Sequence, residues 1–231
     1  MRREQESRGL TTSDAPEADD AGQEAAPARR RAGRKARETR ERLIEGTLLA
    51  LCDEGVTGIT TRKIAEKADV HLGTLHYHFE SKDALLMAVL DTLGARLAQQ
   101  LRLGVAGSRD LDECIERVLE TDWIIAERNL AIQIVQYELT LYALRTEGAA
   151  WMARRQYDDY IKAHDDAFAG HASGAPAEAI RRLSQAVMAG IDGIILQELA
   201  APDLARSRGA VRDLIAAMQA LARTLGLHRP R

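Results

Sequence analysis

The chain has 231 residues, of which 45% are apolar and 29% are charged, and its formal net charge at pH 7 is −3. This size and composition allow a sizeable core, so disorder over the whole chain is excluded, and the length suits one large domain or two small ones. No apolar run approaches the roughly 18 residues that a membrane helix needs and no signal segment stands at the start, so we expect a soluble, cytoplasmic protein with no membrane partner.

Residues 1–35 are polar, contain Pro16 and Pro27, and show no hydrophobic period, which predicts a disordered tail with a basic end. Between Arg29 and Arg42 the chain carries eight basic and two acidic residues, a surplus of six positive charges. One short segment is therefore suited to meet an anion, while the rest of the chain is acidic.

A first helix is predicted from Arg37, because apolar residues recur at three- and four-residue steps between Leu43 and Leu51. The pattern ends at Gly55 and Gly58, and glycine commonly ends helices. Aromatic residues form only 4% of the chain and no segment alternates like a strand, so helices are favoured throughout.

Two short helices are predicted next, Thr61–Ala68 and Leu72–Phe79, separated by a three-residue turn. With the preceding helix they form the helix-turn-helix arrangement, whose second helix fits the major groove of DNA. Six apolar residues are expected to hold this unit together from inside, namely Ile64, Ala65, Ala68, Val70, Leu75 and Phe79.

A long helix then begins at Lys82, behind the capping residue Ser81, and stops near Gly104. Further helical periods cover residues 111–128, 130–147, 149–169, 177–200 and 207–226. We therefore predict an all-α chain with a tail (1–35), a three-helix helix-turn-helix domain (36–82) and a larger helical bundle behind it (83–231).

Polar side chains line the outward side of the predicted helix-turn-helix. Hydroxyl, imidazole, guanidinium and ammonium groups are donors that contact DNA phosphates, and Gly73 permits close backbone approach. The candidate DNA-binding residues are Thr61, Arg62, His71, Leu72, Gly73, Thr74, His76, Tyr77, His78 and Lys82. By spacing alone, the same pattern also suits the polar surface of any three-helix scaffold.

The stretches Ile59–Val70, Gly73–Phe79 and Ser81–Leu86 closely resemble the DNA-binding domain of the TetR family of bacterial transcriptional regulators. The most specific part is the run Gly-Thr-Leu-x-Tyr-His-Phe-x-Ser-Lys that starts at Gly73, and the resemblance covers Arg37–Leu86. It implies that the matching residues touch operator DNA, mostly its phosphates, and that residues 83–231 bind a ligand and dimerise.

Three positions depart from the family pattern. His71 stands where a small polar residue is usual, Leu72 where a polar or basic residue often reaches the bases, and His76 where Tyr is customary. Because Leu72 cannot donate a hydrogen bond, base recognition is expected to depend on Arg62, His71 and Thr74.

The basic run Arg29–Lys35 lies just ahead of the first predicted helix. It fits an arm that reaches phosphates or an adjacent minor groove, and it also fits a solvated tail. For an arm, deletion of residues 1–35 is expected to weaken operator binding and to flatten its salt dependence.

Two apolar stripes near the end of the chain fit either its own core or a four-helix dimer interface of the kind that family members use. One short recognition helix makes few base contacts, so a homodimer on two half-sites is expected in any case. The candidate interface residues are Val187, Ile191, Ile194, Ile195, Leu214, Met218, Leu221 and Leu225.

Most of the scarce aromatic residues gather in the middle helices, where a small-molecule effector is expected, although aromatic residues at helical spacing are more often core. The candidate ligand-binding residues are Trp123, Gln133, Tyr137 and Trp151. The interval between His164 and His171 does not fit a metal site and no catalytic signature appears, so we expect no metal, cofactor or catalytic residue.

These features predict a transcriptional repressor that binds double-stranded, pseudo-palindromic operator DNA as a homodimer and is released by a small-molecule effector. An activator or a corepressor-dependent regulator would share the same DNA-binding domain, and an assembly protein without DNA binding or an enzyme is a further alternative. The long helix from Lys82 joins the two domains, so the effector is expected to act by moving it and changing the spacing of the recognition helices.

Overall fold

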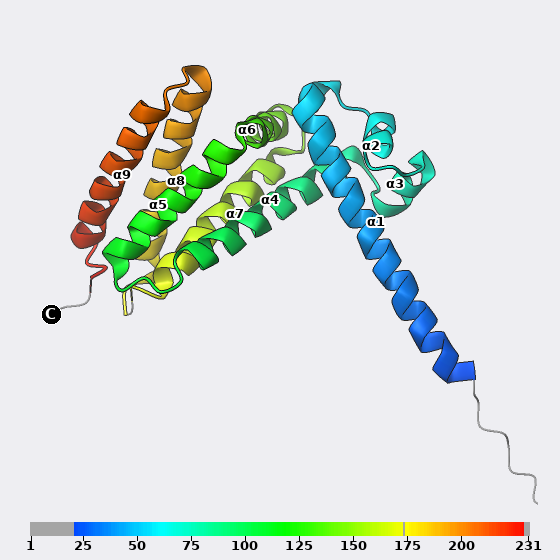
Figure 1. The fold of residues 1–231 in the computed structure, drawn as a ribbon, viewed down its shortest axis with the longest axis horizontal. Coiled ribbons are helices and arrows are strands. Elements are labelled where there is room, and N and C mark those ends of the chain that lie inside the picture. The colour runs from blue at the N-terminus through cyan, green and yellow to red at the C-terminus, as the bar shows by residue number, and fades with distance from the viewer. Residues whose placement is uncertain (1–20, 173, 229–231) are drawn as a thin grey trace, which may run out of the picture. The chain divides into compact units, whose positions relative to one another are not determined.

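The computed structural model describes residues 21–172 and 174–228, with side chains from residue 30 onward except residue 32. Within these residues every regular element is an α-helix, which confirms the all-α prediction (Figure 1). The helices are α1 (Ala21–Gly58), α2 (Thr61–Lys67), α3 (Leu72–His78), α4 (Lys82–Gly104), α5 (Leu111–Arg128), α6 (Leu130–Arg145), α7 (Ala150–Ala169), α8 (Ala177–Ala200) and α9 (Leu204–Thr224). The chain forms two compact units, which meet in sequence between Thr39 and Arg40.

In the first unit, α1 begins at Ala21, whereas the sequence predicted a disordered tail as far as residue 35. That prediction is wrong for residues 21–35, and for residues 1–20 it lies outside the described residues. Alanine and arginine account for nine of the 15 residues from 21 to 35, and both have high helix propensity. An ion pair between successive turns also stabilises the helix, since Arg34 Nε lies 3.6 Å from Glu38 Oε1.

The second unit contains the helix-turn-helix, in which five of the six predicted inner residues are buried and Val70 is half-buried. Ile64, Leu75 and Phe79 are at most 5% exposed. Gly46 of α1 lies so close to α2 that a Cβ at this position would stand 2.7 Å from the backbone of Ala68. Because only glycine lets the two backbones approach this far, Gly46 sets the contact between α1 and α2.

The turn between α2 and α3 is closed by backbone geometry. Asp69 has φ 51°, in the left-handed region that Asp tolerates better than most residues. The amide of Val70 donates to the carbonyl of Ala65 (3.0 Å) and so ends α2. At the other end of α2, the hydroxyl of Thr60 accepts a hydrogen bond from the Lys63 amide (3.3 Å), which is an N-cap.

Near its end, α1 breaks at Gly55, whose φ of 68° and ψ of 171° are not helical. Glycine suits this backbone because it has no Cβ to clash. The amide of Val56, just past the break, donates to Oε2 of Glu138 in α6 (3.0 Å). The end of α1 therefore depends on a side chain 82 residues further along the chain.

Two clusters of buried residues fill the second unit. The first joins the end of α1, α2 and α3 with parts of α4, α6 and α7, so the helix-turn-helix shares one core with the neighbouring bundle helices. The second joins the rest of α4 and α7 with α5, α8 and α9. α7 packs against α4, α6 and α8, and α9 packs against α8 and α5 (Figure 1). In the described part of the chain no helix is both long and apolar enough to cross a membrane.

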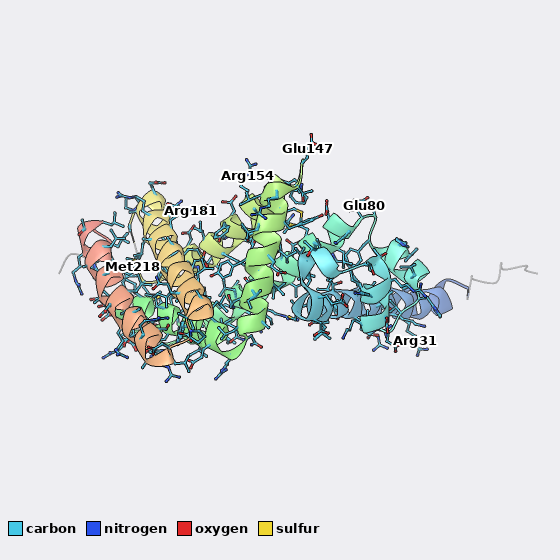
Figure 2. All side chains as sticks on the ribbon, turned by 90° about the horizontal axis from the view of Figure 1, so that it is seen from above. Arg31, Glu80, Glu147, Arg154, Arg181 and Met218 are labelled. Carbon is cyan, nitrogen blue, oxygen red and sulfur yellow. The ribbon has the colours of Figure 1, made fainter. Side chains whose placement is uncertain are left out.

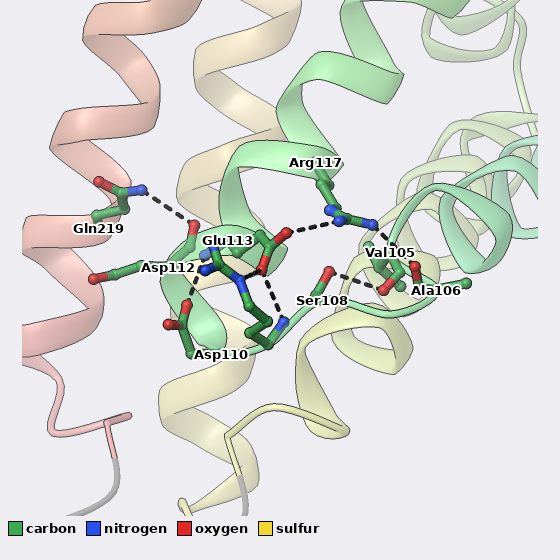
Figure 3. A network of polar contacts seen from close by, with 9 residues as sticks. Val105, Ala106, Ser108, Asp110, Asp112, Glu113, Arg117 and Gln219 are labelled. Carbon is green, nitrogen blue, oxygen red and sulfur yellow. Dashed lines mark hydrogen bonds and ion pairs between the residues drawn. The ribbon is translucent and has the colours of Figure 1, made fainter.

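A network of hydrogen bonds stabilises the start of α5 (Figure 3). The carboxylate of Glu113 accepts hydrogen bonds from Arg109 Nε (2.7 Å), the Arg109 amide (2.9 Å) and the guanidinium of Arg117 (2.6 Å). The side chain of Arg109, its backbone amide and Arg117, in that order, lower the pKa of Glu113 to about 2. Gln219 of α9 donates to the carbonyl of Asp112 (3.1 Å), so the same turn also ties α9 to α5.

Candidate DNA-binding surface and ligand cavity

Helix α3 buries one side and exposes the other. Leu75 is 2% exposed, whereas Tyr77 is 84% and Leu72 41% exposed. Nothing lies within 4 Å of where a Cβ on Gly73 would stand, so the backbone there is open to a large partner. Of the other candidates on this surface, Arg62, His71 and His76 are exposed, and Thr61, Thr74 and His78 are half-buried. Helix α3 thus presents its polar groups outward, as a recognition helix must, and their contact with DNA stays a prediction.

Two lysines of α2 are already paired within the chain. Lys63 forms an ion pair with Glu54, and Lys67 Nζ lies 2.6 Å from Asp53 Oδ2. These pairs balance the positive charge of α2, so affinity for DNA is not expected to come from a broad basic surface here. Arg62 precedes these two lysines on α2 and is exposed.

Lys82 has a different environment from the predicted one. Its Nζ donates to the carbonyls of Val56 (3.2 Å) and Ile59 (3.4 Å) and lies 5.8 Å from the centre of the Tyr142 ring. Carbonyls at a helix end attract a cation, and so does the face of an aromatic ring. Two of the three N–H donors are thus engaged within the chain, so Lys82 ties the start of α4 to the end of α1, and its contact with phosphate stays a prediction.

The basic segment of the first unit is helical. Arg30, Arg31, Arg34 and Lys35 lie on α1 with exposed side chains, and Arg31 is labelled in Figure 2. The predicted arm is therefore helical, within a helix that begins at Ala21, and its exposed basic side chains give it a positive charge that attracts anions.

A cavity of about 320 Å³ lies within the second unit among α4, α5, α6, α7 and α8. Sites for small organic ligands have volumes of this size and larger. Its apolar lining consists of Leu93, Leu97, Ile125, Ile132, Met188, Ile191 and Ile195. Its polar lining consists of Arg96, Gln100, Asp122, Arg128, Asn129, Gln133, Gln136, Tyr137, Gln156, Tyr157, Tyr160 and Asp192.

Two of the four predicted ligand-binding residues line this cavity, and two do not. Gln133 and Tyr137 are part of its wall. Trp123 instead packs among the apolar residues of the second core and is 4% exposed. Trp151 is 47% exposed at the start of α7. Neither tryptophan belongs to the cavity, because an aromatic residue at helical spacing can face the core or solvent equally well.

Asp122 and His164 form a buried pair beside the cavity. His164 Nε2 lies 3.0 Å from Asp122 Oδ2, and its Nδ1 lies 2.8 Å from the carbonyl of Tyr160. Burial lowers the pKa of His164, but the Asp122 charge, its hydrogen bond and the Tyr160 carbonyl outweigh it and the pKa is raised. Since both ring nitrogens face acceptors, the protonated imidazolium can donate to both.

Asp192 of α8 is held by two phenols. Tyr137 donates to its Oδ1 (3.2 Å) and Tyr157 donates to its Oδ2 (3.0 Å). Burial raises the pKa of Asp192 above its ordinary range, and the two hydrogen bonds offset only part of that effect. Burial first, and then the charge of Asp192, also raise the pKa values of Tyr137 and Tyr157, so both phenols stay protonated as donors.

Further side-chain hydrogen bonds hold the remaining wall in place. Tyr160 donates to the side-chain carbonyl of Gln136, and Gln136 donates to Gln133 (3.1 Å). Thr140 donates to Gln156 (2.8 Å). Because each amide is oriented by a neighbour, the polar groups of the wall are preorganised.

The carboxylates of this cavity were not among the residues predicted from the sequence. Asp122 lies in the apolar face of α5, and His164 pairs with it from 42 residues away. Asp192 follows Ile191 and comes shortly before Ile194 and Ile195, within the apolar stripe of α8. An acidic residue inside that stripe is the sequence feature from which the site could have been predicted. An acid at an otherwise buried position is uncommon unless it is paired or functional.

The predicted dimer residues on α8 and α9 fall into two groups. Val187, Ile191 and Ile195 are at most 5% exposed within the single chain. Their assignment to a dimer surface is wrong, because they already pack in the second core. The other predicted residues, Ile194, Leu214, Met218, Leu221 and Leu225, are half-buried, and Met218 is labelled on α9 in Figure 2. Leu196 of α8 is 49% exposed and was not predicted.

An exposed recognition helix in a helix-turn-helix, followed by helices that enclose a ligand-sized cavity, defines a DNA-binding transcriptional regulator of the ligand-binding type. Residues 43–89 match the family model described as "Bacterial regulatory proteins, tetR family". Residues 107–221 match the model described as "Tetracyclin repressor-like, C-terminal domain". The chain belongs to the TetR family, in which ligand-responsive repression is typical.

Known proteins support this placement at different levels. The nicotine-responsive transcriptional repressor HdnoR of Paenarthrobacter nicotinovorans is 26% identical over 77% of this chain and 92% of its own length. The class D tetracycline repressor of Escherichia coli is 41% identical over 61 residues, which are 26% of this chain and 28% of the repressor. A transcriptional regulator from Rhodococcus sp. Rha1 shares the fold, with a TM-score of 0.64 at 19% identity over 80% of this chain and 96% of that structure.

Proposed function

We propose that the chain is a dimeric repressor that binds pseudo-palindromic operator DNA through α3 and releases it when a small molecule occupies the cavity. The observation that carries this proposal is the two-sided character of α3, with Leu75 buried and Tyr77 84% exposed. The likeness to a relative named as a nicotine-responsive repressor supports release by a small molecule. In this proposal residues 36–82 bind DNA, and residues 83–231 bind the effector and dimerise; the chain is cytoplasmic and carries out no catalysis.

The dimer surface in this proposal is the outward side of α8 and α9. Leu196 is exposed there, and the half-buried Leu214, Met218 and Leu221 leave apolar area uncovered within one chain. Two copies that pack these helices together would form a four-helix interface with two-fold symmetry. Such a dimer would present two recognition helices to half-sites roughly 34 Å apart.

Helix α6 supports a route from the cavity to the DNA-binding helices. Its residues Gln133 and Tyr137 line the cavity. The next residue, Glu138, accepts the Val56 amide at the break in α1. A ligand that moves Tyr137 would therefore also move the group that holds the end of α1.

The same helix reaches α4. The hydroxyl of Tyr142 donates to Asp83 Oδ1 (2.7 Å) in the first turn of α4, and the ring lies beside the ammonium of Lys82. Helix α4 also lines the cavity through Leu93 and Leu97. We infer that α6 and α4 shift together, and a differential affinity of about 1–3 kcal/mol per site is enough to release much of the DNA.

DNA binding is tested by fluorescence anisotropy on fragments that flank the chain's own gene. Arg62→Ala is expected to weaken binding by about tenfold, because it removes an exposed cation beside α3. Arg154→Ala is the matched control, since Arg154 is an exposed arginine on α7 (Figure 2) and lies outside the predicted surface. Equal affinities of the two variants, or no binding of the wild-type chain at low salt, would overturn the proposal.

A second test addresses the basic segment Arg29–Lys35. The slope of log affinity against log salt concentration counts the phosphates that a protein neutralises. Deletion of residues 1–35 is expected to weaken operator binding and to reduce this slope by about one for each lost phosphate contact. An unchanged slope would show that this segment does not contact DNA.

A further inference from the structure

The two acidic residues in the cavity wall differ in whether a basic side chain lies beside them. Two carboxylates, Asp122 and Asp192, line the cavity. Asp122 already has a partner that can carry a positive charge, since His164 Nε2 lies 3.0 Å from its Oδ2. For Asp192, the hydrogen-bond partners within the described residues are the hydroxyls of Tyr137 and Tyr157, which orient the carboxyl group and supply no positive charge.

The surroundings of Asp192 suit an organic group that carries a positive charge. Three phenol rings, those of Tyr137, Tyr157 and Tyr160, line the same cavity. The negative face of an aromatic ring attracts a cation, and the attraction grows where water is excluded. Ile191 and Ile195 lie on either side of Asp192 in α8 and supply apolar wall for the rest of a ligand.

We propose that the cavity binds a protonated organic amine, whose N–H donates to the Asp192 carboxylate while its apolar part fills the space beside it. This inference rests on the proposed function, because it names the chemical class of the effector. A half-buried carboxylate that lacks a cation is costly, and a ligand ammonium ion would supply that cation. A charge-assisted hydrogen bond to a partly desolvated acid also gives more discrimination than apolar contact alone.

The two arginines of the lining do not compete for Asp192. Arg96 forms an ion pair with Glu45, and Arg128 is exposed at the end of α5. Tighter binding of a carboxylate ligand, held by these arginines, is the opposite outcome.

The test compares three ligands of similar shape and different charge on the full-length chain by isothermal titration calorimetry near neutral pH. The ligands are N,N-dimethylbenzylamine, which is protonated, isobutylbenzene, which is neutral, and phenylacetate, which is anionic. The amine is expected to bind at least about tenfold more tightly than the hydrocarbon, and phenylacetate more weakly than both. Equal affinity for amine and hydrocarbon, or tightest binding of phenylacetate, overturns the proposal.

The variant Asp192→Asn tests whether Asp192 is the residue that binds the amine. It is expected to lower affinity for the amine by about tenfold or more and to leave that for isobutylbenzene unchanged. Asp213→Asn is the matched control, because Asp213 is an exposed acid on α9 outside the cavity. An unchanged amine affinity in Asp192→Asn overturns the proposal. The ranking of the three ligands on the wild-type chain decides the question even if this variant fails to fold.

Failure of this inference differs from failure of the proposed function. A chain that binds its operator and shows no preference for the amine keeps the proposed function and overturns the amine site. A chain that prefers the amine and binds none of its flanking DNA supports the amine site and overturns the proposed function.

Discussion

The Asp122–His164 pair is expected to be a large local contribution to stability. Both side chains are at most 7% exposed, and their closest atoms are 3.0 Å apart. Removing one partner of a buried pair leaves the other without its partner, which typically costs about 3–5 kcal/mol. We therefore expect Asp122→Ala to lower the free energy of unfolding by about 3–5 kcal/mol.

Asp122→Asn separates charge from hydrogen bonding. The Asn amide can donate to Nε2 of a neutral His164, whose Nδ1 still donates to the Tyr160 carbonyl. Most of the loss is therefore expected to be restored, leaving a cost of about 1 kcal/mol. Asp166→Ala is the control, because Asp166 and Lys162 form an ion pair of which both side chains are 67% exposed. Exposed pairs contribute about 0–1 kcal/mol.

Urea unfolding at one fixed protein concentration measures these differences, since the stability of a dimer depends on concentration. The pKa of His164 is raised, so the pair contributes fully below the ordinary histidine pKa of about 6.5, and this contribution is lost as the pH rises through the raised value. The difference between wild type and Asp122→Ala should accordingly shrink at alkaline pH. If Asp122→Ala costs no more than Asp166→Ala, His164 is not held in a charged pair.

Three further outcomes test other contacts. Gly46→Ala should lower stability by about 1–3 kcal/mol and weaken DNA binding, because its Cβ would stand 2.7 Å from the backbone of α2; the open position Gly170→Ala should change neither. Glu138→Ala should accelerate hydrogen exchange of the Val56 amide, which loses its acceptor, and unchanged exchange would show that the contact is absent in solution. The pKa of Glu113 is lowered, so its contribution is present above about pH 4.3 and lost as the pH falls toward 2; Glu113→Gln should have a flatter acid unfolding profile, and parallel profiles would contradict the lowered pKa.

The helices were largely predictable because their signals are local. The periods over residues 111–128 and 177–200 coincide with α5 and α8, and Ser81 caps α4 as expected, accepting from the Ala84 amide (3.0 Å). The start of α1 was missed, because residues 21–35 have helix propensity without the apolar stripe by which the helix was sought.

The side chains of α8 show why a stripe alone does not identify its partner. Ile191 and Ile194 are three residues apart and fit one apolar face, yet Ile191 is buried in the chain's own core and Ile194 is half-buried. Periodicity indicates which side of a helix is apolar, and only the packing of neighbouring helices determines how much of that side one chain covers.

By itself, the amino-acid sequence determined the all-helical class, the helix-turn-helix with its buried Leu75 and outward Tyr77, and the family, because these depend on propensity, spacing and a short motif. Only the tertiary structure determined where the cavity lies and which side chains meet in its wall. Asp122 and His164 meet across 42 residues, and Tyr137 reaches Asp192 across 55. Such contacts arise from how α5, α6, α7 and α8 pack against one another, and no local pattern in any one of these helices encodes them.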